Sequence, residues 1–102
     1  MLLETQGDVE AYAQIFDALS QSVRITMIRM ISEADELPCT VLDETLPIAK
    51  STISYHVKTL HHAGLIEVRK DGRHYFYRIR REVIDRYVPG LIERLTLATA
   101  NA

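Results

Sequence analysis

The sequence has little cysteine and no long hydrophobic run, and each absence excludes a class of protein. Cys39 is the one cysteine among 102 residues, so the chain cannot form an internal disulfide, which fits a reducing compartment such as the cytoplasm. No apolar run approaches the roughly 20 residues that a helix needs to cross a membrane. The segment Met1–Glu4 has neither the basic nor the long apolar region of a secretory signal. We therefore expect a cytoplasmic protein that does not bind a membrane.

Motifs for catalysis are also missing. The sequence has no glycine-rich phosphate loop, no nucleophile motif and no pair of carboxylates on a plausible cleft, so we expect no enzymatic activity. It has no internal repeat and no low-complexity tract either. With 47% hydrophobic and 25% charged residues, the composition is that of an ordinary globular protein. We expect residues 1–102 to form a single domain around one core.

Acidic and basic residues are nearly balanced overall but not along the chain. The formal net charge of −2 speaks against a nucleic-acid partner, because nucleic-acid-binding domains are usually basic. Residues 50–81, however, contain eight basic and two acidic side chains, a net charge of +6, which leaves −8 for the remainder. All four histidines and three of the five tyrosines also lie in this segment. Its charge favours a polyanionic partner.

Apolar residues recur every three or four positions, which predicts amphipathic helices. The charged stretch Glu33–Pro38 ends in proline and is expected to be an irregular connection before a further short helix. Ser20 is predicted to be the N-cap of the second helix. Pro89-Gly90 interrupts the last helix, so either a kink or two abutting helices are expected there. The predicted helices span about Asp8–Leu19, Ser22–Ala34, Cys39–Thr45, Lys50–His62 and residues 81–98.

A β-hairpin is predicted around Asp71-Gly72, because this dipeptide is typical of a two-residue type I′ turn. Such a turn would pair Lys70 with Arg73 and, further out, Val68 with Tyr75. Since side chains alternate between the two faces of a strand, one face is expected to be apolar and to pack on the helices. That face would carry Ile66, Val68, Tyr75 and Tyr77, while Arg69 and His74 would point the other way. The predicted strands are Leu65–Lys70 and Arg73–Arg78.

These elements predict a mainly α fold with one small β-hairpin, in which a helix-turn-helix pair is followed by a wing. The helix-turn-helix spans about residues 39–63, the wing about 65–78 and a C-terminal helix about 81–98. In a winged helix-turn-helix, the second helix of the pair enters a major groove of double-stranded DNA and the hairpin contacts the flanking backbone. We therefore expect a sequence-specific DNA-binding regulator of transcription.

The predicted helix Lys50–His62 and the hairpin carry side chains suited to DNA. Basic side chains bind phosphates or guanine, hydroxyls make short contacts, and Tyr55 suits a phosphate or a thymine methyl group. His56 is either a phosphate contact or a packing residue. The contribution of the hairpin is expected to depend on salt and not on sequence. The predicted DNA-binding residues are Lys50, Ser51, Thr52, Ser54, Tyr55, His56, Lys58, Arg69, Lys70, Arg73 and His74.

Several short motifs occur together in one order. They are Phe16-Asp17-Ala18-Leu19-Ser20, Arg24-Ile25, the run from Ser51 to Leu60, Ala63-Gly64-Leu65-Ile66 and the run from Gly72 to Arg78. Over about residues 10–80 the sequence resembles the ArsR family of bacterial winged-helix repressors. The resemblance implies a homodimer, built from the first and last helices, that binds a palindromic operator and releases it when an effector binds.

The sequence departs from the metal sensors of this family. The arsenic-sensing branch has a C-x-C pair at the positions of Pro38 and Thr40, so Cys39 alone supplies one thiolate where trivalent arsenic needs more. The zinc- and nickel-sensing pattern includes histidine on the last helix, which here carries Asp85 and Glu93 but no histidine. We therefore expect no metal site and no cofactor.

Alternatives stay open at several residues. Ala49 stands where the resemblance places a capping serine, so either Ser51 caps the helix or its stability falls by about 1 kcal/mol. Cys39 is either a small, partly buried residue or a redox-sensitive thiol or metal ligand that gates DNA binding. His61 and His62 either cap carbonyl groups and face solvent or ligate a metal between subunits.

Two broader alternatives concern the effector and the partner. The effector is unknown, and four side chains expected in the core could instead line a pocket for an organic effector. These four are Tyr12, Met27, Met30 and Tyr87. A second alternative, from another functional class, is a protein-interaction module whose terminal helices recruit a partner and whose basic face is incidental.

Overall fold

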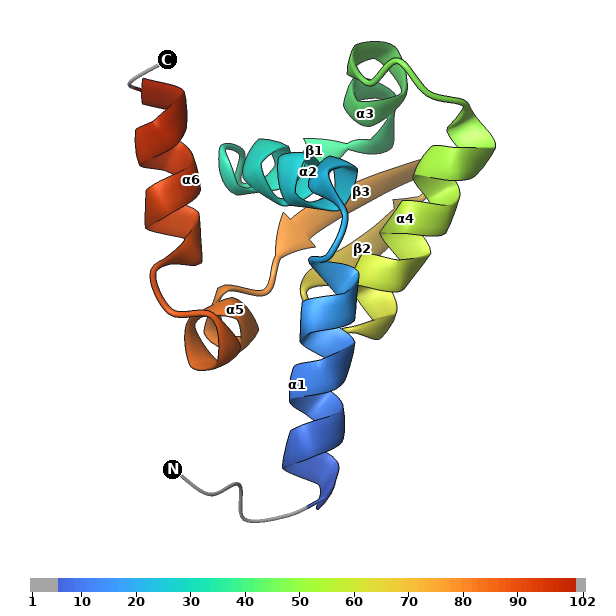
Figure 1. Ribbon diagram of the computed structural model, residues 1–102. Coiled ribbons are helices and arrows are strands. Elements are labelled where there is room, and N and C mark those ends of the chain that lie inside the picture. Colours follow the sequence, from blue (N-terminus) through green and yellow to red (C-terminus); the bar gives the residue numbers. More distant parts are fainter. Residues whose placement is uncertain (1–5, 101–102) are drawn as a thin grey trace.

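The computed structural model describes the backbone of residues 6–100 and the side chains of residues 7–97. Met1–Glu4, where no secretory signal is expected, lies outside the described residues. Within residues 6–100 the chain forms six helices and three short strands (Figure 1). They are α1 (Gln6–Ala18), α2 (Ser22–Ser32), β1 (Leu37–Pro38), α3 (Cys39–Thr45), α4 (Lys50–His62), β2 (Ile66–Asp71), β3 (His74–Ile79), α5 (Arg81–Tyr87) and α6 (Leu91–Ala100).

The expected winged helix-turn-helix fold is confirmed. The helices α3 and α4 form the helix-turn-helix, and β2, β3 and the turn between them form the wing. Figure 1 shows α2 in the middle of the molecule, with α3, α4 and the wing on one side and α6 on the other. The helix α2 contacts both β3 and α6, so it connects the wing to the C-terminal helix. The largest fully buried side chains are Met27, Ile28, Ile31, Leu42, Leu60, Leu65, Ile66 and Ile84.

The segment predicted to be an irregular connection contains a short strand. Leu37 pairs with Tyr77 and Pro38 with Phe76, so β1 is the edge strand of an antiparallel sheet with the order β1-β3-β2. Proline is tolerated there because an edge strand leaves one row of backbone groups unpaired. Leu37 is buried and anchors the strand to the core. A two-residue strand is too short for side-chain alternation to reveal it in the sequence.

The predicted hairpin forms, but its register is shifted by two residues. Val68 pairs with Tyr77 instead of Tyr75, and the two turn residues are Gly72 and Arg73. Gly72 has a φ of +63°, and no other type of residue in the described chain has a positive φ. A type I′ turn needs two positive φ angles in succession, whereas a type II′ turn places one glycine first. Because a shift of two residues preserves alternation, the four residues predicted on the apolar face still share it.

One predicted helix cap is wrong, and one of the two alternatives at another helix start holds. The hydroxyl of Ser20 donates a hydrogen bond to the carbonyl of Asp17 over 2.6 Å, so Ser20 closes α1 and does not cap α2. Gln21 holds the N-cap position of α2 and makes no capping side-chain bond. The N-cap of α4 is Ala49, also without a capping bond, so the weaker-cap alternative holds. Backbone amides without such a cap are available to other acceptors at the start of a helix.

The C-terminal segment is split into two helices instead of being kinked. Gly90, with a φ of +86°, lies between α5 and α6 and lets the chain change direction. The buried side chains of Ile84 on α5 and Ile92 on α6 hold both helices on the core. No helix in residues 6–100 is both long enough and apolar enough to span a membrane.

Candidate nucleic-acid interface

The helix α4 has one buried and one exposed face. Ile53, Val57 and Leu60, spaced at i, i+4 and i+7, lie in the core and fix the rotation of the helix about its axis. The opposite face is polar, basic and open to solvent. It carries six of the predicted DNA-binding residues, namely Lys50, Ser51, Thr52, Ser54, Tyr55 and Lys58.

A groove of about 460 Å³ separates α4 from the wing. Ser54 and Lys58 line it from the helix, and Lys70 lines it from β2. The ammonium of Lys70 lies 5.7 Å from the ring centroid of Tyr75, which also lines the groove. The structure thus brings three predicted site residues together and places a lysine on each wall, so the groove favours an anionic occupant.

His61 and Tyr75 also line this groove but were not among the predicted DNA-binding residues. The sequence held a signal for His61, because Ser54, Lys58 and His61 are spaced at i, i+4 and i+7 and therefore share a face of α4. Tyr75 was assigned to the face that packs on the helices, yet it is exposed. Its position near the wing tip, beyond the reach of the helical core, explains the difference.

The wing divides its basic side chains between two faces and a tip. Arg73 and His74 lie exposed at the turn. Arg69 lies on the face opposite Lys70 and forms a forked ion pair with Glu36, with N–O distances of 2.9 and 2.6 Å. Its guanidinium also lies 4.5 Å from the ring centroid of Phe76. Arg69 already has a carboxylate partner, whereas Lys70 and Arg73 have none among the residues that the structure describes.

This ion pair shifts the titration of both partners. The hydrogen bond from Arg69 lowers the pKa of Glu36 from its ordinary 4.5, and the same bond raises the pKa of Arg69. Both side chains are partly exposed, and screening by solvent keeps the contribution of such pairs to stability small. The pair connects the wing to the segment that precedes β1, so it orients the wing more than it stabilises the fold.

His56 differs from the other predicted site residues because it is buried. Its side chain is 6% exposed, and its Nδ1 accepts a hydrogen bond from Nε of Arg24 over 3.0 Å. Burial, followed by the positive charge of Arg24, lowers the pKa of His56 from its ordinary 6.5. The imidazole is therefore neutral at pH 7. Of the two roles considered for His56, this position favours packing over a phosphate contact.

The residues considered for sensing have different surroundings. Cys39 is partly buried at the start of α3 and forms no disulfide. Met27 is fully buried in the core, and Tyr12 packs edge-to-face on Tyr87 with a centroid distance of 4.8 Å. Within the described residues, no three side chains of histidine, cysteine, aspartate or glutamate come close enough together to hold a metal ion.

Comparisons with known proteins agree in one family. A family profile described as a helix-turn-helix domain matches residues 19–69. YceK of Bacillus subtilis (strain 168), an uncharacterized HTH-type transcriptional regulator, is 42% identical over 91 residues, which are 88% of this chain and 91% of YceK. The arsenical resistance operon repressor of Staphylococcus aureus is 29% identical over 77 residues, 76% of this chain and 73% of that repressor. The solved structure of an ArsR-like transcriptional regulator from Rhodococcus sp. RHA1 is similar, with a TM-score of 0.72 and 26% identity over 93% of this chain and 88% of that one.

Proposed function

Because this chain belongs to the ArsR family of winged helix-turn-helix transcriptional regulators, we propose that it represses transcription by binding an operator in double-stranded DNA. The helix α4 is the recognition helix and enters a major groove, while the wing contacts the flanking backbone. Repression follows because a bound operator occludes its promoter. The protein acts in the cytoplasm, where its lone Cys39 stays reduced.

The observation that carries this proposal is the groove between α4 and the wing. Lys58 and Lys70 face it from opposite walls, and Ser54 adds a hydroxyl group. A sugar-phosphate strand that passes between a recognition helix and a wing meets such side chains from both sides. Six of the eight basic side chains of residues 50–81 lie on α4 and the wing, so attraction to DNA is concentrated near the groove.

The exposed residues take different roles in this proposal. Lys50 contacts a phosphate or guanine, and Ser54 and Tyr55 contact base edges and so determine sequence preference. Arg73 at the wing tip contacts phosphates or the minor groove. His56 is left out because it is buried. The remaining proposed contacts are Ser51, Thr52, Lys58, Arg69, Lys70 and His74.

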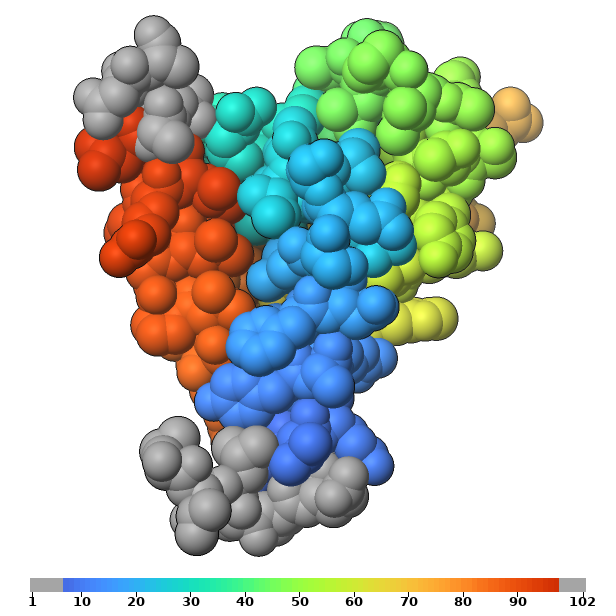
Figure 2. All heavy atoms as spheres, in the orientation of Figure 1, coloured from blue at the N-terminus to red at the C-terminus, as the bar shows by residue number. Residues whose placement is uncertain are grey.

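The proposed repressor is a homodimer. Of five large hydrophobic side chains that are exposed within residues 7–97, three lie on the first and last helices, namely Val9, Phe16 and Leu97. Figure 2 shows α1 beside α5 and α6 on one face of the molecule, with α3 and α4 at its other side. Pairing of α1 and α6 with a second copy would cover this apolar surface and present two recognition helices to the two halves of a palindromic operator.

The direct test is enrichment of bound duplexes from a random-sequence pool, followed by a gel shift with the enriched duplex and a scrambled one. We expect a palindromic consensus and an affinity that falls steeply with salt. Ser54→Ala should change the preferred sequence, whereas Arg29→Ala, on α2 and outside both the proposed DNA surface and the proposed dimer helices, should not. Absence of any retarded band with random duplex at low salt would contradict DNA binding and favour an interaction module.

A further inference from the structure

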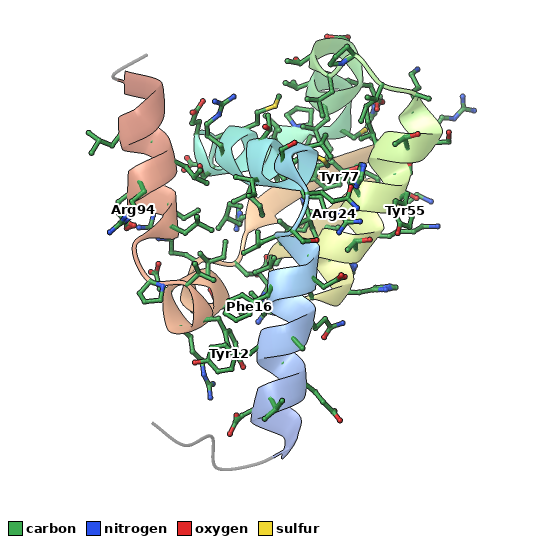
Figure 3. The ribbon with its side chains drawn as sticks, viewed as in Figure 1. Tyr12, Phe16, Arg24, Tyr55, Tyr77 and Arg94 are labelled. Atoms are coloured by element: carbon green, nitrogen blue, oxygen red, sulfur yellow. The ribbon has the colours of Figure 1, made fainter. Side chains whose placement is uncertain are left out.

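Arg24 connects three helices at a point hidden beneath the DNA-facing surface. It lies near the start of α2 and is 2% exposed. Its Nε donates to Nδ1 of His56 on α4 over 3.0 Å, and its Nη1 donates to the carbonyl of Asp17 at the end of α1 over 3.3 Å. Its Cζ lies 5.6 Å from the ring centroid of Tyr55. Figure 3 shows Arg24 and Tyr55 beside each other where the upper end of α1 approaches α4.

The chemistry of this contact is unusual for a purely structural role. A buried arginine usually pairs with a carboxylate, but within the described residues both hydrogen-bond acceptors of Arg24 are uncharged. Burying a cation without a counter-charge is costly, and replacement of buried ionic groups by apolar residues of similar volume is often neutral or stabilising. A planar guanidinium differs from an apolar side chain because its hydrogen-bond donors are held in a rigid fork. It can therefore fix the orientation of the groups around it.

The side chain next to the guanidinium of Arg24 on the surface of α4 is that of Tyr55. This side chain is 59% exposed on the proposed DNA-contacting face of α4. Its ring lies next to the guanidinium of Arg24 and is tilted against the ring of His56, with a centroid distance of 5.5 Å and an interplanar angle of 60°. A cation beside an aromatic face attracts it. An exposed tyrosine would otherwise occupy several rotamers, and only one of them places its hydroxyl at a given base.

We propose that Arg24 is a positioning residue for base recognition: held by the carbonyl of Asp17 and by Nδ1 of His56, it fixes Tyr55 and the adjoining turn of α4 in the orientation that contacts base edges. The proposal rests on the proposed function, since it assumes that α4 enters the major groove. Arg24 does not touch DNA itself. Its loss therefore affects the choice among sequences more than attraction to DNA as such.

This role predicts a specific pattern of binding defects. Phosphate contacts from Lys58, Lys70 and Arg73 do not depend on Arg24, so the affinity for scrambled duplex should persist when Arg24 is replaced. Affinity for the enriched duplex should fall. A structural defect instead lowers the folded fraction, which reduces both affinities by the same factor. The ratio of the two affinities separates these cases.

The experiment compares binding of enriched and scrambled duplexes by fluorescence anisotropy, after circular dichroism has established the folded fraction of each variant. Arg24→Met and His56→Leu should each lower the affinity ratio at least about tenfold, equivalent to about 1.4 kcal/mol. His56→Asn keeps an acceptor near the position of Nδ1 and should retain the wild-type ratio within about threefold. Arg24→Lys, which keeps a charge but not the fork, is the second variant if Arg24→Met fails to fold.

A double-mutant cycle with Tyr55→Ala completes the test. Tyr55→Ala alone should lower the ratio, and adding Arg24→Met should lower it little further, because both changes remove the same contact. Equal weakening of both duplexes by Arg24→Met and His56→Leu, or full additivity with Tyr55→Ala, would overturn the positioning role. A wild-type protein with no preference for the enriched duplex would overturn the proposed function instead, so the two failures are distinguishable.

Discussion

At the scale of single residues, His56 has surroundings that none of the other three histidines shares. His61, His62 and His74 are exposed. His56 is buried against Arg24, and its protonation would replace a hydrogen bond by two adjacent cations. Acidification therefore removes an interaction between α2 and α4 at His56.

The first prediction concerns stability against pH. Because the folded-state pKa of His56 lies below its ordinary 6.5, the unfolded chain binds this proton more readily than the folded one. The stabilisation is thus fully present above pH 6.5 and is lost as pH falls through the lowered pKa. Urea unfolding between about pH 8 and about pH 5 should show this decline, and His56→Asn should remove it. If the free energy of unfolding of His56→Asn declines with pH as it does in the wild type, then titrating groups other than His56 cause the decline.

The side chains that point to solvent could be predicted from the sequence, but their partners could not. The helical period of Ile53, Val57 and Leu60 places Ser54 and Lys58 on the outer face, where the structure has them. The same period says nothing about Arg69, whose charge is paired with Glu36, 33 positions away. Contacts at that separation depend on the path of β1 and β2, which no local pattern contains.

At the scale of elements, the wing shows why a register error left the candidate site largely intact. The dipeptides Asp71-Gly72 and Gly72-Arg73 both contain the glycine that a tight turn needs, and the sequence cannot choose between them. The structure chooses the second, so β3 runs to Ile79 and pairs it with Ile66. Since two residues are one period of a strand, Lys70 keeps its face and still lines the groove beside α4.

A second prediction follows from the position of Arg73 at this turn. Its exposed side chain has no ion-pair partner within the described residues, so it is available to a phosphate. Arg73→Ala should weaken binding to enriched and scrambled duplexes alike and lower the slope of log affinity against log salt by about one unit. Arg29→Ala, on α2 and outside both the proposed DNA surface and the proposed dimer helices, is the matched control. A slope that does not change would remove the wing tip from the interface.

At the scale of the whole molecule, the exposed apolar side chains fall into two groups. Tyr55 and Tyr75 lie on α4 and the wing, whereas Val9, Phe16 and Leu97 lie on α1 and α6. The first group borders the proposed DNA surface. The second has no such partner in a monomer, and exposed apolar surface of this kind is typical of protein interfaces.

A third prediction tests the dimer through Phe16, which is 56% exposed and packs on Tyr12 with a centroid distance of 5.9 Å. Phe16→Glu should give a monomer in sedimentation equilibrium and weaken operator binding at least about tenfold, because a glutamate is costly to bury and one half-site remains unoccupied. Gln14→Glu adds the same charge to α1 near the carbonyl of His62 and should leave the dimer intact. If Phe16→Glu sediments as a dimer, as the wild-type protein is expected to do, the dimer interface does not include Phe16.

The last prediction concerns the division of charge between +6 on residues 50–81 and −8 on the remainder. The molecule measures 43 × 34 × 22 Å along its principal axes, dimensions comparable with the Debye length of about 30 Å at 0.01 M salt and several times the length of about 8 Å at 0.15 M. The acidic part should therefore oppose non-specific attraction to DNA only at low salt.

The test combines Glu10→Gln with Glu33→Gln. This double variant should bind scrambled duplex more tightly than the wild type at about 0.01 M salt and equally well at about 0.15 M salt. The charge-neutral Gln14→Ala should leave the affinity unchanged at both salt concentrations. An equal rise in affinity at both salt concentrations would indicate a short-range contact. No rise in affinity at low salt would mean that the acidic residues do not weaken the attraction of the basic face to DNA.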